Sequence, residues 1–174
     1  MSSKKSRSAR RIVPRTSSLP WIRLRGLLLA NASIVLNLMH AEYFLDTNIL
    51  LYAASSAKSE QSKRLKAREL LMEDGASLSV QVLAEFYVNA TSKFKLPHDK
   101  VVRMIEALDS YPILAVSEDV FWAALQIKER YKLSYWDSAI MAAAVQLGCH
   151  TVYSEDLNHG QMYAGVRVIN PFAV

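Results

Sequence analysis

Short apolar runs alternate with stretches of helical periodicity along most of this chain. Thr47 and Asn48 can each cap a helix after the first run, and Val82, Phe86 and Ala90 recur at helical spacing after the second. Strands that read as continuous apolar runs and alternate with helices indicate an α/β fold around a mainly parallel sheet. The predicted strands are 42–46, 76–80, 113–116, 150–154 and 166–169, and the main predicted helices are 61–74, 81–93, 100–108, 117–131 and 134–148.

Charge is distributed unevenly along the 174 residues, whose net charge is +5. Residues 1–41 carry eight basic residues and no acidic residue, so 13 basic and 16 acidic residues remain in 42–174. The excess positive charge therefore belongs to the N-terminal segment, which weakens any inference from net charge to nucleic-acid binding. The length and the half-apolar composition predict one globular domain, which we place at 42–174.

The N-terminal segment, residues 1–41, has several interpretations. We expect a basic, disordered extension or a true start at Met39, while a signal peptide is the less favoured alternative. The apolar run 26–39 is short for a membrane span and is interrupted by Asn31 and Asn37, so no stable membrane association is expected. The single cysteine, Cys149, excludes an internal disulfide and fits a reducing, cytoplasmic location.

Carboxylates stand where predicted strands end. Asp46 ends the first strand and Asp156 follows the fourth. In open parallel sheets, ligands bind beyond the carboxyl ends of the strands, where the strand order reverses. If the first and fourth strands are neighbours, the two carboxylates share that crevice. Asp46 could instead only cap a helix, but Thr47 and Asn48 could do so without a charge, so we favour a functional role.

Two further acids have good structural alternatives. Glu85 could be an ordinary surface residue, although Asn89 lies one turn further on the same helix face. Asp137 could complete a capping box that begins at Ser134. It also stands at the start of a helix that is apolar nearly all round, which would point an acid into the interior or a cleft. Capping and catalysis are compatible, so both interpretations stay open.

The candidate ligands carry oxygen atoms only. Such a set suits Mg²⁺, or Mn²⁺ in its place, rather than zinc, and the histidines show no zinc-ligand spacing with Cys149. The chain has no glycine-rich phosphate loop and no serine-nucleophile elbow. Tyr135 and Trp136 are expected in the core rather than on a stacking surface. The residues therefore predict metal-assisted chemistry.

Four segments in order resemble the PIN domain, specifically the VapC-like toxin ribonucleases of type II toxin–antitoxin pairs. The resemblance runs from about Tyr43 to Phe172, and the long basic N-terminus departs from the family pattern. The segments are Phe44-Leu45-Asp46-Thr47-Asn48, Val80-Gln81-Val82-Leu83-Ala84-Glu85-Phe86, Tyr135-Trp136-Asp137-Ser138-Ala139-Ile140 and Tyr153-Ser154-Glu155-Asp156-Leu157-Asn158-His159-Gly160.

The resemblance implies a three-layer α/β/α sandwich with strand order 3-2-1-4-5. It implies divalent-metal-dependent RNA cleavage, inhibition by a cognate antitoxin protein, and frequent homodimers. Carried over by residue, the catalytic acids are Asp46, Glu85, Asp137 and Asp156, and the metal is held by Asp46, Asp137 and Asp156. The residues that would orient these ligands are Thr47, Asn48, Asn89 and Ser154.

Two alternatives to the toxin interpretation remain. One is an RNA-processing or DNA nuclease on the same fold, although the arched insertions and extra basic helices of such enzymes are not visible in the sequence. The other is a non-catalytic RNA-binding protein with a PIN-like core. Loss of the acids would favour that second alternative, and all four positions carry an acid.

Overall fold

The computed structural model describes residues 41–173. The predicted extension 1–41 and the predicted start at Met39 lie outside the described residues, apart from Ala41. The predicted domain, residues 42–174, is described through Ala173. Within this part of the chain, no helix combines the length and the apolar character needed to cross a membrane.

The described residues build one sheet with strand order β3-β2-β1-β4-β6-β5. Neighbouring strands are parallel, except that β5 runs antiparallel to β6 at the edge. The predicted order 3-2-1-4-5 is confirmed for the five predicted strands, the last of which is β6. The strands are β1 (Tyr43–Leu45), β2 (Ala76–Ser79), β3 (Ile113–Leu114), β4 (Thr151–Tyr153), β5 (Met162–Tyr163) and β6 (Val166–Ile169). The short β5 was not predicted, because two residues give no periodicity to detect.

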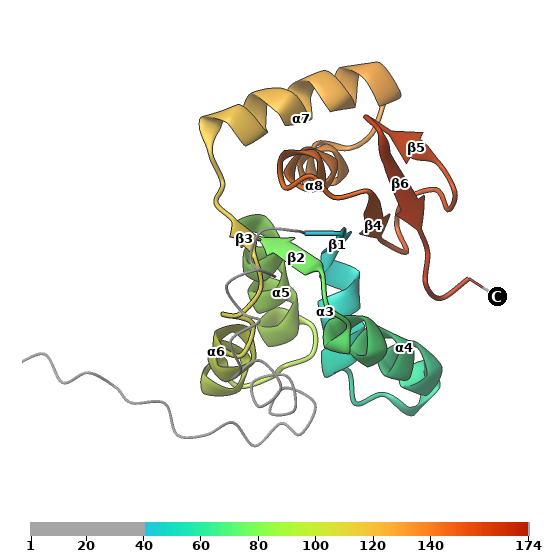
Figure 1. The fold of residues 1–174 in the computed structure, drawn as a ribbon. Helices are drawn as coiled ribbons and strands as arrows, with labels where there is room; N and C mark the ends of the chain where they lie inside the picture. The colour runs from blue at the N-terminus through green and yellow to red at the C-terminus, as the bar shows by residue number, and fades with distance from the viewer. Residues whose placement is uncertain (1–40, 174) are drawn as a thin grey trace, which may run out of the picture.

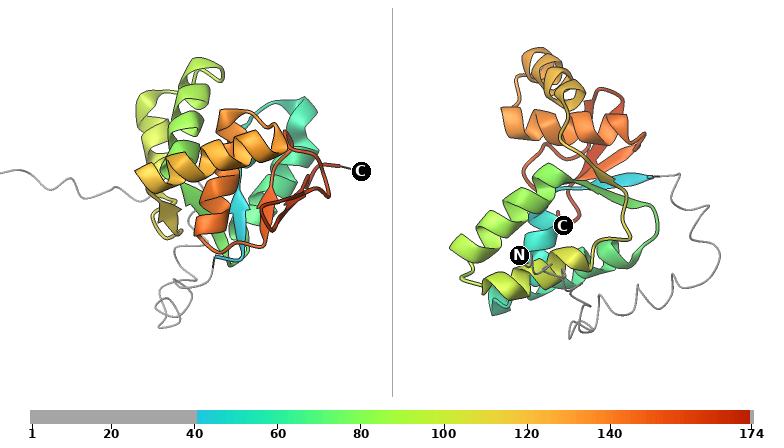
Figure 2. Two further views of the ribbon diagram at one scale, coloured as in Figure 1. Left: turned by 90° about the horizontal axis from the view of Figure 1, so that it is seen from above. Right: turned by 90° about the vertical axis from the view of Figure 1, so that its left-hand side faces the viewer.

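Helices cover both faces of the sheet. The α-helices are α3 (Thr47–Ala54), α4 (Gln61–Met72), α5 (Val80–Ser92), α6 (His98–Glu106), α7 (Glu118–Tyr131) and α8 (Tyr135–Gln146), and a 3₁₀ turn, η1 (Lys58–Glu60), precedes α4. Helices α7 and α8 lie on one face, and α3, α4, α5 and α6 lie on the other (Figure 1; two further views in Figure 2). The predicted three-layer α/β/α sandwich is thus confirmed.

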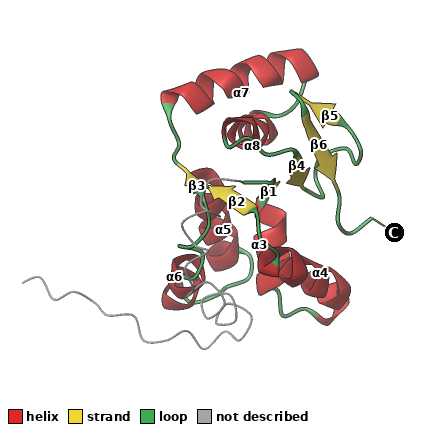
Figure 3. Cartoon of the chain, in the orientation of Figure 1, coloured by secondary structure: helices red, strands yellow, loops and turns green. Residues whose placement is uncertain are grey.

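Serine residues cap three of the helices, which Figure 3 shows in red. Ser79 caps α5 and Ser117 caps α7, each accepting a hydrogen bond from a main-chain N–H of the first turn. Ser134 caps α8 in the same way. The caps at Ser117 and Ser134 agree with the sequence prediction. Ser79 ends β2 and Ser117 follows β3 by three residues, whereas Ser134 lies in the short connection between α7 and α8.

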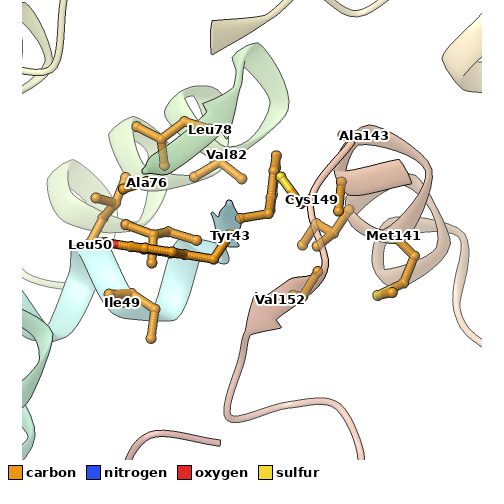
Figure 4. Packing of buried hydrophobic residues seen from close by; sticks show 14 of the residues in the cluster. Tyr43, Ile49, Leu50, Ala76, Leu78, Val82, Met141, Ala143, Cys149 and Val152 are labelled. Atoms are coloured by element: carbon orange, nitrogen blue, oxygen red, sulfur yellow. The ribbon is translucent and has the colours of Figure 1, made fainter. Parts of the chain in front are cut away.

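The core lies on both sides of the central strands. Phe44, Leu45 and Val152 on β1 and β4 are fully buried. Leu78 and Val82 pack on one side and Met141 and Ala143 of α8 on the other (Figure 4). Helix α8 is buried at every position from Ser138 to Ala144, as its continuous apolar sequence predicts. This packing holds the carboxyl ends of β1 and β4 in one fixed place.

Candidate functional site

Asp46 and Ser154 meet at the carboxyl ends of adjacent strands. Strands β1 and β4 are parallel with Leu45 opposite Tyr153, and the Asp46 amide donates to the Tyr153 carbonyl at 3.1 Å. The residues that follow, Asp46 and Ser154, therefore lie opposite each other, and Ser154 Oγ donates to Asp46 Oδ2 at 2.6 Å. The strand order reverses between β1 and β4. The predicted condition for a shared crevice, that these two strands are neighbours, is met.

Asp46 is the most strongly perturbed acid of the site. It is 4% exposed, and its Oδ1 accepts from the Thr47 amide at 2.5 Å at the start of α3. The helix cap is therefore Asp46 itself, the structural alternative that the sequence left open for this acid, and not Thr47 or Asn48. Burial raises the pKa of Asp46 from 3.8 to about 7, because it outweighs the hydrogen bonds from Ser154 and Thr47, while the negative charges of Asp156 and Glu85 raise it further.

Asp156 is held beside Asp46 by a turn and by an amide. The buried Ser154 hydroxyl accepts from the main-chain amides of Asp156, at 3.1 Å, and Leu157, at 3.4 Å. Asn48 Nδ2 donates to Asp46 Oδ2 at 2.9 Å and to Asp156 Oδ2 at 3.4 Å. The Asp156 side chain is exposed, so the pair consists of one buried acid, Asp46, and one acid at the surface.

Glu85 reaches the same region from α5. Its Oε2 accepts from Thr47 Oγ1 at 3.1 Å, and its Oε1 accepts from Gln81 Nε2 at 2.8 Å. Gln81 also donates to the Trp136 carbonyl at 3.3 Å, which joins α5 to the start of α8. Sequence reasoning missed Gln81, although its place one turn before Glu85 on the same helix face was a usable signal.

Asn89 and Asp137 are engaged locally. Asn89 Nδ2 donates to the main-chain carbonyl of Glu85 at 2.8 Å, so its amide binds its own helix. Asp137 Oδ2 accepts from Ser134 Oγ at 2.7 Å, and the Asp137 amide donates to the same hydroxyl at 3.1 Å. Asp137 therefore takes part in capping α8, and its half-buried carboxylate lies one residue beyond the Gln81 contact. A catalytic role for Asp137 stays a prediction.

An apolar pocket of about 410 Å³ opens beside Glu85, between α5 and the start of α8. Its walls include Val88, which is 57% exposed, and Trp136, which is 61% exposed. The expectation that Trp136 belongs to the core is therefore wrong. The apolar face of α8 becomes buried only from Ser138 onward, so the first turn leaves the indole at the surface. Tyr135, its neighbour, is half-buried.

The donor set fits a hard divalent cation in part. Asn48 Oδ1 is a buried acceptor oxygen, and it has no hydrogen-bond partner among the described residues. The amide nitrogen of this side chain, not this oxygen, donates to Asp46 and Asp156, so the oxygen would bind a cation shared with the two acids only if the amide turned over. Within residues 41–173, however, no three Asp, Glu, His or Cys side chains are grouped closely enough to form a metal site by themselves. Binding by Asp46, Asp137 and Asp156 together stays a prediction.

Comparison with protein-family models decides the family. The PIN domain model matches residues 43–164, which is most of the chain. The chain belongs to the PIN domain family. The match covers β1 through β5 and therefore includes all four predicted acids. No curated protein sequence matches the chain.

Solved structures share the PIN fold of this chain. A toxin–antitoxin complex from Klebsiella pneumoniae is similar with a TM-score of 0.57 and 22% identity over 76% of this chain and 100% of that chain. VapC20 of Mycobacterium tuberculosis, described as a sarcin-ricin loop cleaving toxin, has a TM-score of 0.56 and 18% identity over 72% and 99%. VapBC2 from Rickettsia felis, bound to a promoter DNA fragment, has a TM-score of 0.53 and 19% identity over 72% and 96%.

Proposed function

We propose that this PIN domain protein is a divalent-metal-dependent endoribonuclease and the toxin of a toxin–antitoxin pair. One observation carries the proposal. In a PIN fold, the carboxylates of Asp46 and Asp156 lie side by side at the carboxyl ends of two adjacent strands, joined by Asn48 and Ser154. A buried acid beside a second acid gains most from a bound cation, because the cation removes both the desolvation and the repulsion penalties.

Asp46 and Asp156 would hold the metal, with Asp137 approaching from the start of α8 and Glu85 from α5. When bound, Mg²⁺ or Mn²⁺ supplies a water of lowered pKa and stabilises negative charge on the phosphate. Asp46 must lose the proton that its raised pKa allows it to keep near neutral pH. Ser154 and Asn48 orient the Asp46 carboxylate, and Thr47 and Gln81 orient the two oxygens of Glu85.

The partners follow from the similar structures and from the surface. Two of these structures are named as toxin–antitoxin or VapBC assemblies, and a third is named as a toxin that cleaves the sarcin-ricin loop. These descriptions support an antitoxin protein as the inhibitor of this chain and RNA as its substrate. The exposed apolar surface along α5, with Val80 45% and Val88 57% exposed, supports a homodimer. We place the enzyme in the cytoplasm, without stable membrane association.

The test is cleavage of a structured single-stranded RNA by the purified protein. Cleavage is expected in Mg²⁺ or Mn²⁺ and should stop in EDTA. Asp46→Asn and Asp137→Asn should each abolish cleavage without unfolding the protein, which circular dichroism can verify. Asp74→Asn is the matched control, because Asp74 is an exposed acid beside Gly75, at the opposite end of β1.

Several results would contradict the proposal. Cleavage that persists in EDTA, or that requires zinc, would exclude the metal chemistry. Near-normal turnover of Asp46→Asn would exclude the site. Preferential cleavage of DNA would favour a DNA nuclease on the same fold, and RNA binding without cleavage in any divalent metal would favour a non-catalytic PIN protein.

A further inference from the structure

A second polar cluster lies on the outer side of the turn that carries Asp156. Glu155 points away from the Asp46 site toward α3 and α4. One of its oxygens accepts from Lys63 Nζ of α4, and the other accepts from Tyr52 Oη of α3. Both oxygens of a single carboxylate are thus bound by side chains about a hundred residues earlier in the chain.

Lys63 is fixed on several sides. Its ammonium group donates to Tyr52 Oη at 3.0 Å and lies 4.6 Å from the centre of the Tyr52 ring and 5.5 Å from that of Phe172. The rings of Tyr52 and Phe172 meet edge to face at 4.9 Å. The cluster therefore joins α3, α4, the Ser154–Asp156 turn and the C-terminal segment.

The ion pair between Lys63 and Glu155 is partly shielded from water. The two side chains are 35% and 27% exposed, whereas those of the Lys66–Glu69 pair on the same helix are 46% and 63% exposed. Partial burial weakens screening by solvent, so the first pair holds its geometry better than the second.

One face of α3 contacts both acids of the turn, Glu155 and Asp156. Asn48 and Tyr52 are four residues apart, so they lie on the same helix face. Asn48 contacts Asp156, and Tyr52 contacts Glu155. The turn is therefore held from the inside by Ser154 and Asn48 and from the outside by Tyr52 and Lys63. A loosened outer contact would let the exposed Asp156 move away from Asp46.

We propose that Lys63 and Tyr52 are positioning residues that hold Glu155, and through it the Ser154–Asp156 turn, so that Asp156 binds the divalent cation together with Asp46. This role rests on the proposed function. A basic residue near such a site would ordinarily be assigned to contact with the RNA phosphates. The proposal instead assigns Lys63 to holding Glu155.

The test is the midpoint of Mg²⁺ binding to the full chain, which is the free Mg²⁺ concentration that half-fills the site in a calorimetric titration. Lys63→Met removes the charge and keeps the aliphatic stem, and Tyr52→Phe removes only the hydroxyl. Loss of a residue that orients a metal ligand weakens metal binding by about tenfold or more, so we expect the midpoint to rise about tenfold in Lys63→Met. Lys66→Met, the matched control, should keep the wild-type midpoint, and Lys63→Arg should restore most of it.

Hydrogen exchange in EDTA gives a readout that needs no metal. The amides of Asp156 and Leu157, which donate to Ser154 Oγ, should exchange faster in Lys63→Met than in Lys66→Met. The effects of Lys63→Met and Glu155→Gln on these exchange rates should not add in the double variant, because each substitution removes the same contact.

The outcomes separate this role from the proposed function. A Mg²⁺ midpoint that stays at the wild-type value in both Lys63→Met and Tyr52→Phe overturns the positioning role, even if both variants melt at a lower temperature. A wild-type protein that responds to neither Mg²⁺ nor Mn²⁺ overturns it as well. A wild-type protein that binds Mg²⁺ but cleaves no RNA overturns the proposed function alone, because the midpoints still decide the positioning role.

Discussion

Removing the charge of Asp46 should stabilise the metal-free protein, although the residue lies at the centre of the proposed site. The pKa of Asp46 is raised from 3.8 to about 7, chiefly by burial. The folded state therefore holds the proton more tightly than the unfolded state does. The resulting stabilisation is fully present below pH 3.8 and is lost as the pH rises through about 7.

The size of the effect follows from the shift of about three pKa units. At about 1.4 kcal/mol per unit, ionised Asp46 lowers the free energy of unfolding by about 4 kcal/mol above pH 7. At pH 5 the folded state is still protonated, and the penalty is about 1.5 kcal/mol. In Asp46→Asn, the Ser154 hydroxyl and the Asn48 amide lose the oxygen to which both donate, which costs about 1–2 kcal/mol at either pH. The stability advantage of the variant should therefore grow by about 2.5 kcal/mol between pH 5 and pH 8.

Urea unfolding in EDTA at pH 5 and pH 8 measures this advantage. At pH 8 the variant should be more stable than wild type by roughly 2–3 kcal/mol. Added Mg²⁺ should raise the melting temperature of wild type by binding only the folded state, and it should raise that of the variant much less. A variant less stable than wild type at pH 8, or equal Mg²⁺ responses in the two proteins, would refute the argument.

Three further predictions concern the surface and the N-terminal segment. Light scattering of the full chain should give the mass of a dimer, and Val88→Glu should give that of a monomer. The control Val145→Glu, at an exposed valine near the C-terminal end of α8, should stay dimeric. A Val88→Glu protein that is still a dimer would exclude the α5 surface as the dimer interface. A protein that starts at Met39 should fold and cleave RNA like the full chain, because the family match begins at residue 43; an inactive or insoluble product would show that the preceding residues are needed. Any RNA contact made by residues 1–38 should be non-specific and should weaken as salt rises, which a filter-binding titration of both proteins can measure.

Local sequence patterns were sufficient for most of the architecture. Five of the strands, the long helices and the caps at Ser117 and Ser134 depend on neighbouring residues, so periodicity and cap chemistry identify them. The four acidic segments were recognisable because they occur in order along the chain. Asp46 and Asp156 follow strands, Asp137 lies near a helix start, and Glu85 lies within a helix. The pair β5 and β6 shows the limit, since the two residues of β5 become a strand only by pairing with β6.

The tertiary structure alone decided which polar groups meet. Ser154 donates to Asp46 across 108 residues, and Lys63 binds Glu155 across 92, contacts that no local pattern encodes. The same holds for Gln81, which joins Glu85 to the start of α8. It holds also for Trp136, a residue type expected in the core that is 61% exposed. Sequence determines the chemistry that each residue can supply. Burial and charge around it, which set the pKa of Asp46 to about 7, arise only when distant segments pack together.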